Sequence, residues 1–417
     1  IKAWKLKTIE LPSGGTIRID YEPDDYAYVQ DKRAMQMFRI QGFAGQQNPA
    51  SLNNQNQLYR KNPYGVNNYL FVKLKHPVQS RQELEAYLPD EDHLYFKAKL
   101  DVIGDGNNDP SDHYEYISGF AEYEEYGLYE NSRQGSSYTH AWIKLKKVNI
   151  GDYKLKRKFK QKKAHPIAKR SWIYSKNNIP KHAFNRSDVQ ENFGRQLQNA
   201  LNSLGDMMKM VKSLNSQLIE RNFARRVKIN KAMVRLNTPD GRKLGGGHRV
   251  GRITLTDQWS KMAPSGQNST YGKVYRYTRQ RNRQSINSGV IAYEPRVGRE
   301  ENPFFQPVFY QHNGDQLYMT KPFGASFFPG PTVGYSRVEI RDLPHPNANP
   351  APAGYKVREF YTAKDFPVIT ERTNLEDQHE RPNPFASFNP FKFRFNETRA
   401  VSQGYKVVLN DMHGKPK

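Results

Sequence analysis

The chain of 417 residues is too long for one small core, so two or three subdomains or one continuous sheet system are expected. Its composition excludes disulfide-bonded and thiol-dependent proteins, because it has no cysteine, and helical membrane proteins, because no stretch reaches the roughly 20 apolar residues of a spanning helix. A formal net charge of +24 favours an anionic partner, such as nucleic acid, an acidic glycan, lipopolysaccharide or an acidic protein.

Residues 8–21 predict a β-hairpin. The Ser-Gly-Gly sequence at 13–15 supplies the positive φ of a tight reversal. After it, Ile17, Ile19 and Tyr21 alternate with polar residues, so one face of the second strand is apolar. We therefore expect a mainly β protein made of antiparallel strand-turn-strand sheets.

The same pattern continues through a β-rich section at 1–150. Strands of alternating apolar and polar residues are separated by polar loops, of which 46–62 is rich in Asn and Gln. The middle of three later strands is expected to end at Tyr123, where an acidic run begins. The further strands are expected at 26–40, 67–74, 95–103, 114–123 and 137–148.

A basic segment dominates the expected connection at 151–186. Aromatic residues, among them Tyr153, Phe159 and Trp172, interleave its lysines, which is the mixture used for phosphate neutralisation and base stacking. We expect a solvated strand pair or loop. Specific polyanion binding, to nucleic acid or acidic glycan, is the alternative, and an acidic region of a parent protein is a third reading; of these ligands, nucleic acid is not the expected one. The candidate polyanion-binding residues are Lys154, Lys156, Arg157, Lys158, Lys160, Lys162 and Lys163.

A helical stripe sets apart the section at 187–236. Apolar residues at 189–218 recur every three or four positions, which predicts one long helix near 187–223, or two helices broken at Gly205, followed by a return strand. We expect this helix to pack against the β-sheet. The alternative is a partner-binding helix whose adaptable surface consists of Leu204, Met207, Met208 and Val211.

The last section, 237–417, is again β-rich. The Thr-Pro-Asp-Gly sequence at 238–241 predicts a turn, and strand candidates at 248–256, 270–279 and 288–293 are separated by Gly, Asn and Pro. Such spacing is typical of an all-β shell, and the strands are expected to form part of a spiralling one.

Two short motifs offer ligand sites, and for both a plain loop is the expectation. Gly245–Gly247 precede a strand rather than a helix, so we expect a turn and not an anion cradle. The second motif places oxygen ligands at alternate positions as calcium loops do. However, Pro110 replaces the usual glycine and no glutamate follows at the required distance, which favours an Asx-rich hairpin loop. The candidate calcium ligands are Asp105, Asn107, Asp109 and Asp112.

The sequence contains no recognised catalytic motif. It has no Gly-x-Ser-x-Gly elbow, no paired His-Glu motif and no phosphate loop, and its histidines lack metal-ligand spacing. We therefore expect a protein that is not an enzyme and has no cofactor other than the calcium considered above. A catalytic group assembled from distant residues would escape this search.

Seven motifs in the last section stand in an order that resembles a known family. This order is similar to the section that precedes the tyrosine-aspartate (YD) repeats in very large RHS-like surface or secreted proteins of Gram-negative bacteria. The resemblance covers about 245–417, and the Leu-Pro-Ser-Gly-Gly-Thr-Ile sequence at 11–17 more loosely. The motifs lie at 245–250, 288–295, 300–303, 323–329, 334–338, 359–367 and 402–416.

The resemblance implies a structural function. Such proteins look like spirals of β-strands that close into a hollow shell around, or carry, another polypeptide, and many occur in bacteria that use type IX secretion across the outer membrane to reach the cell surface. The partners would be other sections of the same polypeptide, its cargo, or surface and secretion proteins. Because the chain begins at Ile1 and not at Met, we expect an internal section of a longer protein. No catalytic residue carries over from the resemblance.

Overall fold

The computed structural model divides the chain into two compact units, each considered by itself. The open-sheet unit comprises Ile1–Ala34, Asp240–Tyr310 and Gln316–Lys417, and the closed-sheet unit comprises Met35–Pro239 and Gln311–Asp315. The first 34 residues thus group with the end of the chain, unlike the sections expected from the sequence. The structure describes residues 4–60, 65–103, 113–150, 163–179, 182–183, 214–263, 265–281, 284–294, 299–312, 315–322, 330, 332–343, 354–372 and 404–417.

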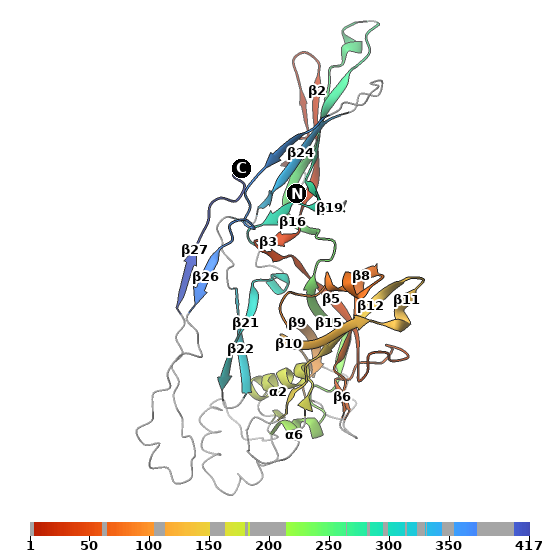
Figure 1. The fold of residues 1–417 in the computed structure, drawn as a ribbon, viewed down its shortest axis with the longest axis vertical. Helices are drawn as coiled ribbons and strands as arrows, with labels where there is room; N and C mark the ends of the chain where they lie inside the picture. Colours follow the sequence, from red (N-terminus) through yellow and green to blue (C-terminus); the bar gives the residue numbers. More distant parts are fainter. Residues whose placement is uncertain are drawn as a thin grey trace. The chain divides into compact units, whose positions relative to one another are not determined.

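Six antiparallel strands form a ring in the closed-sheet unit, in the order β10-β9-β15-β5-β8-β12 (Figure 1). The ring closes because β10 pairs with β9 along its first half and with β12 along its second half. The short β11 (Arg133–Gln134) extends β12. The ring strands are β5 (Met35–Ala44), β8 (Tyr69–Val78), β9 (His93–Asp101), β10 (Tyr114–Leu128), β12 (Ser137–Leu145) and β15 (Val227–Asn237).

Side chains at alternate positions of the ring strands pack together in a single core inside this closed sheet. In β9, for example, Leu94, Phe96, Ala98 and Leu100 all belong to the main cluster of buried apolar residues, as expected for residues at alternate positions of a strand. Helix α2 (Pro166–Asn178) adds the fully buried Trp172 to the same core. Its indole Nε1 donates a hydrogen bond of 2.8 Å to the carbonyl of Phe223.

The open-sheet unit is built on a six-stranded antiparallel sheet in the order β1-β2-β16-β17-β24-β25. The hairpin predicted at 8–21 is confirmed, since Ile9 of β1 pairs with Ile17 of the antiparallel β2. On its other side β2 pairs with β16, where Leu255 lies opposite Ile17. Figure 1 shows the long β2 and β16 side by side. The strands of this sheet are β1 (Thr8–Glu10), β2 (Thr16–Tyr26), β16 (Lys243–Thr256), β17 (Thr270–Arg276), β24 (Arg337–Asp342) and β25 (Lys356–Glu359).

Smaller elements complete the described chain. A four-stranded sheet has the order β23-β20-β3-β4, with β20 and β3 parallel; its strands are β3 (Tyr28–Val29), β4 (Lys32–Arg33), β20 (Gly289–Ile291) and β23 (Val333–Tyr335). The two-stranded pairs are β6 (Tyr59–Arg60) with β7 (Gly65–Val66), β13 (Val148–Asn149) with β14 (Lys163–Ala164), β18 (Thr278–Arg281) with β19 (Gln284–Asn287), β21 (Phe305–His312) with β22 (Asp315–Pro322), and β26 (Ile369–Arg372) with β27 (Tyr405–Val408). The short helices are α1 (Arg81–Glu85), α6 (Leu214–Glu220), η2 (Glu130–Ser132), η3 (Trp259–Lys261) and η4 (Arg299–Glu301).

The mainly β, antiparallel fold is confirmed, and the helices differ in part from expectation. Of the long helix predicted near 187–223, α6 lies inside the range, while 184–213 fall outside the described residues. Helix α2 was not predicted, because the lysine-rich pattern of this segment indicated a solvated loop or strand pair. Proline is tolerated in the first turn of a helix. Among the described residues, no helix is long and apolar enough to cross a membrane.

Candidate functional site

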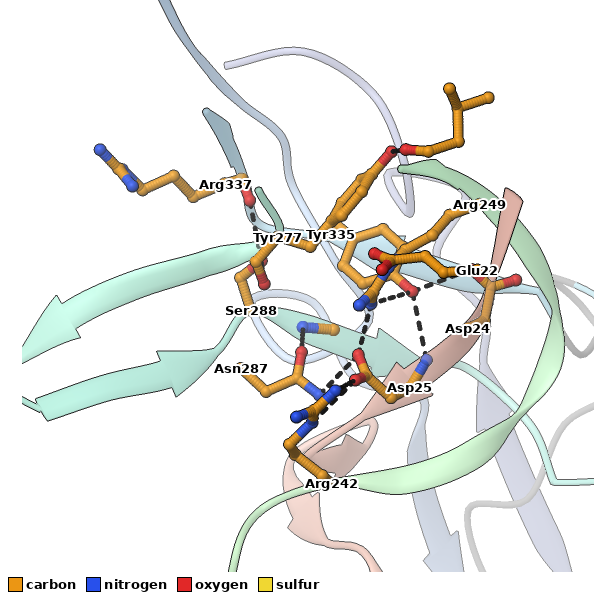
Figure 2. A network of polar contacts seen from close by, with 12 residues as sticks. Glu22, Asp24, Asp25, Arg242, Arg249, Tyr277, Asn287, Ser288, Tyr335 and Arg337 are labelled. Carbon is orange, nitrogen blue, oxygen red and sulfur yellow. Dashed lines mark hydrogen bonds and ion pairs between the residues drawn. The ribbon is translucent and has the colours of Figure 1, made fainter. Parts of the chain in front are cut away.

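Ionisable side chains converge in the open-sheet unit at the end of β2 (Figure 2). They come from β2, from the residue before β16 and from its middle, from the segment between β17 and β20, and from β23. The hydrogen bonds between them join residues up to 311 positions apart. We call this cluster the Asp25 network; its members are Glu22, Asp24, Asp25, Arg242, Arg249, Tyr277, Asn287 and Tyr335.

Asp25 is the buried centre of the network, with 3% of its side chain exposed. Its Oδ2 accepts two hydrogen bonds from Arg242, at 2.9 Å from Nε and 2.7 Å from Nη2. Its Oδ1 accepts from Nδ2 of Asn287 at 3.0 Å and from Nη1 of Arg249. A carboxylate taken out of water needs such partners, and the two arginines and the amide supply them.

Arg249 connects Asp25 to the aromatic side of the network. Its Nε donates to Oε1 of Glu22 at 2.6 Å, and its Nη1 also donates to the Tyr335 hydroxyl at 2.9 Å. The guanidinium lies 4.5 Å from the ring centre of Tyr277 and 5.0 Å from that of Tyr335. Burial disfavours its charge, but the hydrogen bonds that it donates to Asp25, Glu22 and Tyr335 outweigh burial and raise the pKa of Arg249.

The Tyr335 hydroxyl joins Arg249 to Asp24. It donates to Oδ1 of Asp24 at 2.9 Å while accepting from Arg249. Burial raises the pKa of Asp24, and the hydrogen bond from Tyr335 and the charge of Arg249 act against burial. Burial also raises the pKa of Tyr335, so the phenol remains a neutral donor at physiological pH.

The glycines at 245–247 form a bulge in β16 opposite Asp24, not the turn that the sequence indicated. The pairing register jumps from Leu244 opposite Asp25 to His248 opposite Pro23. At Gly247, φ is +137°, and Oδ2 of Asp24 lies 3.0 Å from the position that a Cβ would occupy. The space beside Gly247 is therefore taken by a carboxylate of the chain itself.

A second group of buried charges lies nearby in the same unit. Glu294 is 5% exposed, and its Oε1 accepts from Nζ of Lys243 at 2.9 Å and from the Tyr26 hydroxyl at 2.7 Å. Lys243 also pairs with Glu301 at 3.0 Å. Burial raises the pKa of Glu294, and Lys243 and Tyr26 oppose this effect.

These contacts favour a structural role over a catalytic one. Each buried carboxylate of these two groups accepts hydrogen bonds from a lysine, an arginine or a hydroxyl of the chain, and each of their cations lies against an acid. The acid-base pairs that these contacts offer are Tyr335 with Asp24 and Tyr26 with Glu294, in each of which a phenol donates to a carboxylate. Among the described residues, no group of three or more His, Asp or Glu side chains is placed to hold a metal ion.

A shallow polar groove lies on one face of the β1-β2-β16 sheet. Its lining is rich in hydroxyl groups and carries an exposed ion pair of 3.2 Å between Arg18 and Asp20. Groups of this kind hydrogen bond with water or with a polar ligand. The groove is lined by Thr8, Thr16, Arg18, Asp20, Arg252, Thr254 and Thr256.

Most site residues expected from the sequence fall outside the described part of the chain. This holds for the four calcium candidates at 105–112, the four helix candidates at 204–211, and the basic residues at 154–162. Lys163 is described: it begins β14, and its Nζ contacts Oδ1 of Asn149 at 2.7 Å. The Asp25 network was not predicted, although Pro-Asp-Asp within a strand and the three glycines opposite it are visible in the sequence.

The chain was compared with protein-family models, curated proteins and solved structures. No match was found in any of the three.

Proposed function

We propose that this chain is a structural section of a large RHS-like bacterial cell-surface or secreted protein. In this proposal it is part of a β shell that encloses or presents another polypeptide, and it is not an enzyme. The observation that carries the proposal is the apolar surface of the open-sheet unit. Side chains on several of its strands are largely exposed: Leu244 (68%), Tyr271 (55%), Ile369 (55%) and Val407 (51%).

Exposed apolar side chains on a sheet are expected where a further polypeptide covers that sheet. The apolar row of the hairpin, with Ile17, Ile19 and Leu255, is only partly buried within the unit. Leu255 lies between Ile17 of β2 and Tyr271 of β17, so this apolar row continues across three strands. Exposed apolar surface marks interaction sites when it is contiguous. The ion pairs of the Asp25 network support the same proposal, because they lock distant segments together and leave few groups available for chemistry.

Site-specific photo-crosslinking in the producing cells tests this proposal. A photoreactive residue in place of Tyr271, on the apolar face of the open sheet, should form a crosslink to one defined polypeptide, either a cargo or another section of the same protein. The control position is Arg18, on the polar face of the same sheet. Absence of a defined crosslink at Tyr271, or equal crosslinking at both positions, would rule out the proposed covering of the apolar face.

A further inference from the structure

Lys243 is the centre of the second group of buried charges, and two carboxylates contact its amine. Its Nζ lies 2.9 Å from Oε1 of Glu294 and 3.0 Å from Oε2 of Glu301. Lys243 begins β16, Glu294 follows β20 and Glu301 ends η4, so the three residues meet only in the folded chain. Because a carboxyl carbon is bonded to both of its oxygens, the contact with Oε1 also brings Nζ close to Cδ of Glu294, the atom that an amine attacks.

The two carboxylates differ in their surroundings. The side chain of Glu294 is 5% exposed and that of Glu301 is 32% exposed. Burial raises the pKa of Glu294; Lys243 and Tyr26 oppose this effect, and the charge of Glu301 adds to it. Burial therefore favours the neutral acid at Glu294, which is the form that an amine attacks, because the negative charge of a carboxylate repels a nucleophile. Glu301 keeps contact with water and is placed to act as a base.

Tyr26 places a hydrogen-bond donor at the oxygen that would become negatively charged during such an attack. Its hydroxyl donates to Oε1 of Glu294 at 2.7 Å. Burial raises the pKa of Tyr26, so the phenol remains a neutral donor. Its ring belongs to a buried apolar cluster with Val29, Ile291 and Phe304. A fixed donor at an oxygen where charge develops stabilises the tetrahedral intermediate, and it does so most strongly where water is excluded.

We propose that Lys243 and Glu294 form an intramolecular isopeptide bond, with Glu301 as the base and Tyr26 as the donor to the oxyanion. Glu301 takes one proton from the ammonium group, because a lysine amine is a nucleophile only when it is uncharged. The amine then attacks Cδ of the neutral Glu294, and Tyr26 stabilises the charge on Oε1.

The step needs no oxidant, reductant or further reactant. The Nζ–Cδ bond forms and the Cδ–Oε2 bond breaks, while Oε1 stays as the oxygen of the new amide. Oε2 leaves as water, with the proton of the Glu294 acid and one proton from the nitrogen, which passes through Glu301. One proton remains on the amide nitrogen, and Glu301 releases its last proton to the solvent. Holding the two groups together replaces the high concentration that the same reaction would need in solution.

The bond would covalently link two segments of the open-sheet unit. Its two residues are 51 positions apart in the sequence. The chain has no cysteine, so no disulfide can make such a link. A crosslink that closes a loop of this length restricts the unfolded chain and thereby stabilises the folded one. This inference goes beyond the proposed function and does not depend on it, because all four groups belong to the chain itself.

The test is the intact mass of the whole chain, folded and then denatured for mass spectrometry. We expect a mass lower by one water than the sequence requires. Digestion should release one branched peptide, in which tandem mass spectrometry finds Lys243 joined to Glu294. An ion pair alone loses no mass, so the full sequence mass after prolonged incubation of the folded chain would overturn the proposal. A branch at Glu301 would overturn the roles assigned to the two carboxylates.

The variant Lys243→Arg keeps the positive charge but has no amine to form the bond, and it should have its full sequence mass. The matched control is Lys273→Arg, since Lys273 pairs with Asp342 at 2.8 Å on the exposed surface. This control should still lack one water. If Lys243→Arg also lacks one water, the loss comes from another dehydration, such as a succinimide at Asp240, and the proposal is wrong.

Two further variants test the glutamates separately. Glu294→Gln should form the same bond with loss of one ammonia instead of one water, and loss of water would show that Glu294 is not the residue attacked. Glu301→Gln removes the base and should slow the loss of water at least about a hundredfold after refolding, the effect typical of general base catalysis. An unchanged rate would overturn the role of Glu301. Circular dichroism verifies that each variant is folded.

Discussion

Asp25 shows how single residues hold the open-sheet unit together. An isolated buried carboxylate is costly by several kcal/mol, so its four hydrogen bonds are needed to make burial tolerable. Removing one partner is worse than replacing the whole group, because it leaves a buried charge uncompensated. Loss of Arg249 should show this cost most clearly, because Arg249 also donates hydrogen bonds to Glu22 and Tyr335.

The variant Arg249→Met should destabilise the open-sheet unit by about 3 kcal/mol, the loss typical of a broken buried ion pair. The measurement is the free energy of urea-induced unfolding, and amide exchange in β2 reports on the open-sheet unit by itself. The control Arg18→Met breaks the exposed pair with Asp20, whose side chains are 62% and 42% exposed, and should cost less than about 1 kcal/mol. Equal losses in the two variants would contradict the structural role of the Asp25 network.

His165 plays a comparable role in the closed-sheet unit. It is fully buried and caps α2, with its Nδ1 accepting from the Ile167 amide at 3.2 Å. Its Nε2 carries the proton of the neutral ring, because Nδ1 accepts a hydrogen bond. Burial lowers the pKa of His165 to about 3, against a smaller opposing effect of the Asn67 backbone.

Acidification should therefore weaken the closed-sheet unit. In the unfolded chain His165 takes up a proton below its ordinary pKa of 6.5, whereas in the folded chain it stays neutral down to about 3. Its contribution to stability is thus present above pH 6.5 and is lost progressively as the pH falls, by up to about 1.4 kcal/mol per pH unit.

The variant His165→Asn isolates this effect, because asparagine is a good helix cap that does not titrate. Its free energy of unfolding should depend less on pH between 6.5 and 5 than that of the original chain, even if its absolute stability is lower. The control His182→Asn replaces an exposed histidine of the same unit and should retain the original pH dependence. An unchanged slope in His165→Asn would contradict the buried neutral histidine.

At the scale of elements, alternation predicted most strands, and their extent depended on partners far away in the sequence. The acidic run at the end of β10 indicated that the strand stops at Tyr123. It continues to Leu128 because its second half pairs with β12. Of its acids, Glu125 pairs with Lys144 of β12, and Glu122 pairs with Lys146, which follows β12. The like-charged residues of this strand therefore form ion pairs with lysines of the neighbouring segment. In the sequence alone, such an acidic run looks the same as a solvated loop.

Closure of the sheet and assembly of the Asp25 network were beyond sequence reasoning for the same reason. The strand β10 changes partner from β9 to β12, with an irregularity in register between Tyr123 and Glu125. The network joins Asp24 to Tyr335 across 311 positions. The glycines of β16 were visible as a motif, but a bulge and a turn need the same backbone freedom, so only the strand opposite them decides between the two.

For the whole molecule, the net charge of +24 leaves one sequence-based alternative to test, namely polyanion binding through the lysine-rich segment. Any chain this basic attracts polyanions at low salt, so binding alone does not identify a site. The informative comparison is between removing charges from the segment and removing the same number elsewhere. Seven exposed basic residues outside the segment serve as the matched set: Lys7, Arg33, Lys147, Arg226, Lys231, Lys261 and Arg276.

Two variants, each with seven basic residues changed to Gln, should settle this point through the salt dependence of binding to single-stranded DNA and to heparin. One variant changes the candidate residues at 154–163 and the other the matched set. If the segment is a solvated surface, as expected, both lose affinity equally. A specific site would instead lower the salt slope for single-stranded DNA by up to about 5 in the first variant alone, at roughly 0.7 per phosphate contact. The same selective loss with heparin but not with DNA would indicate an acidic glycan as the ligand.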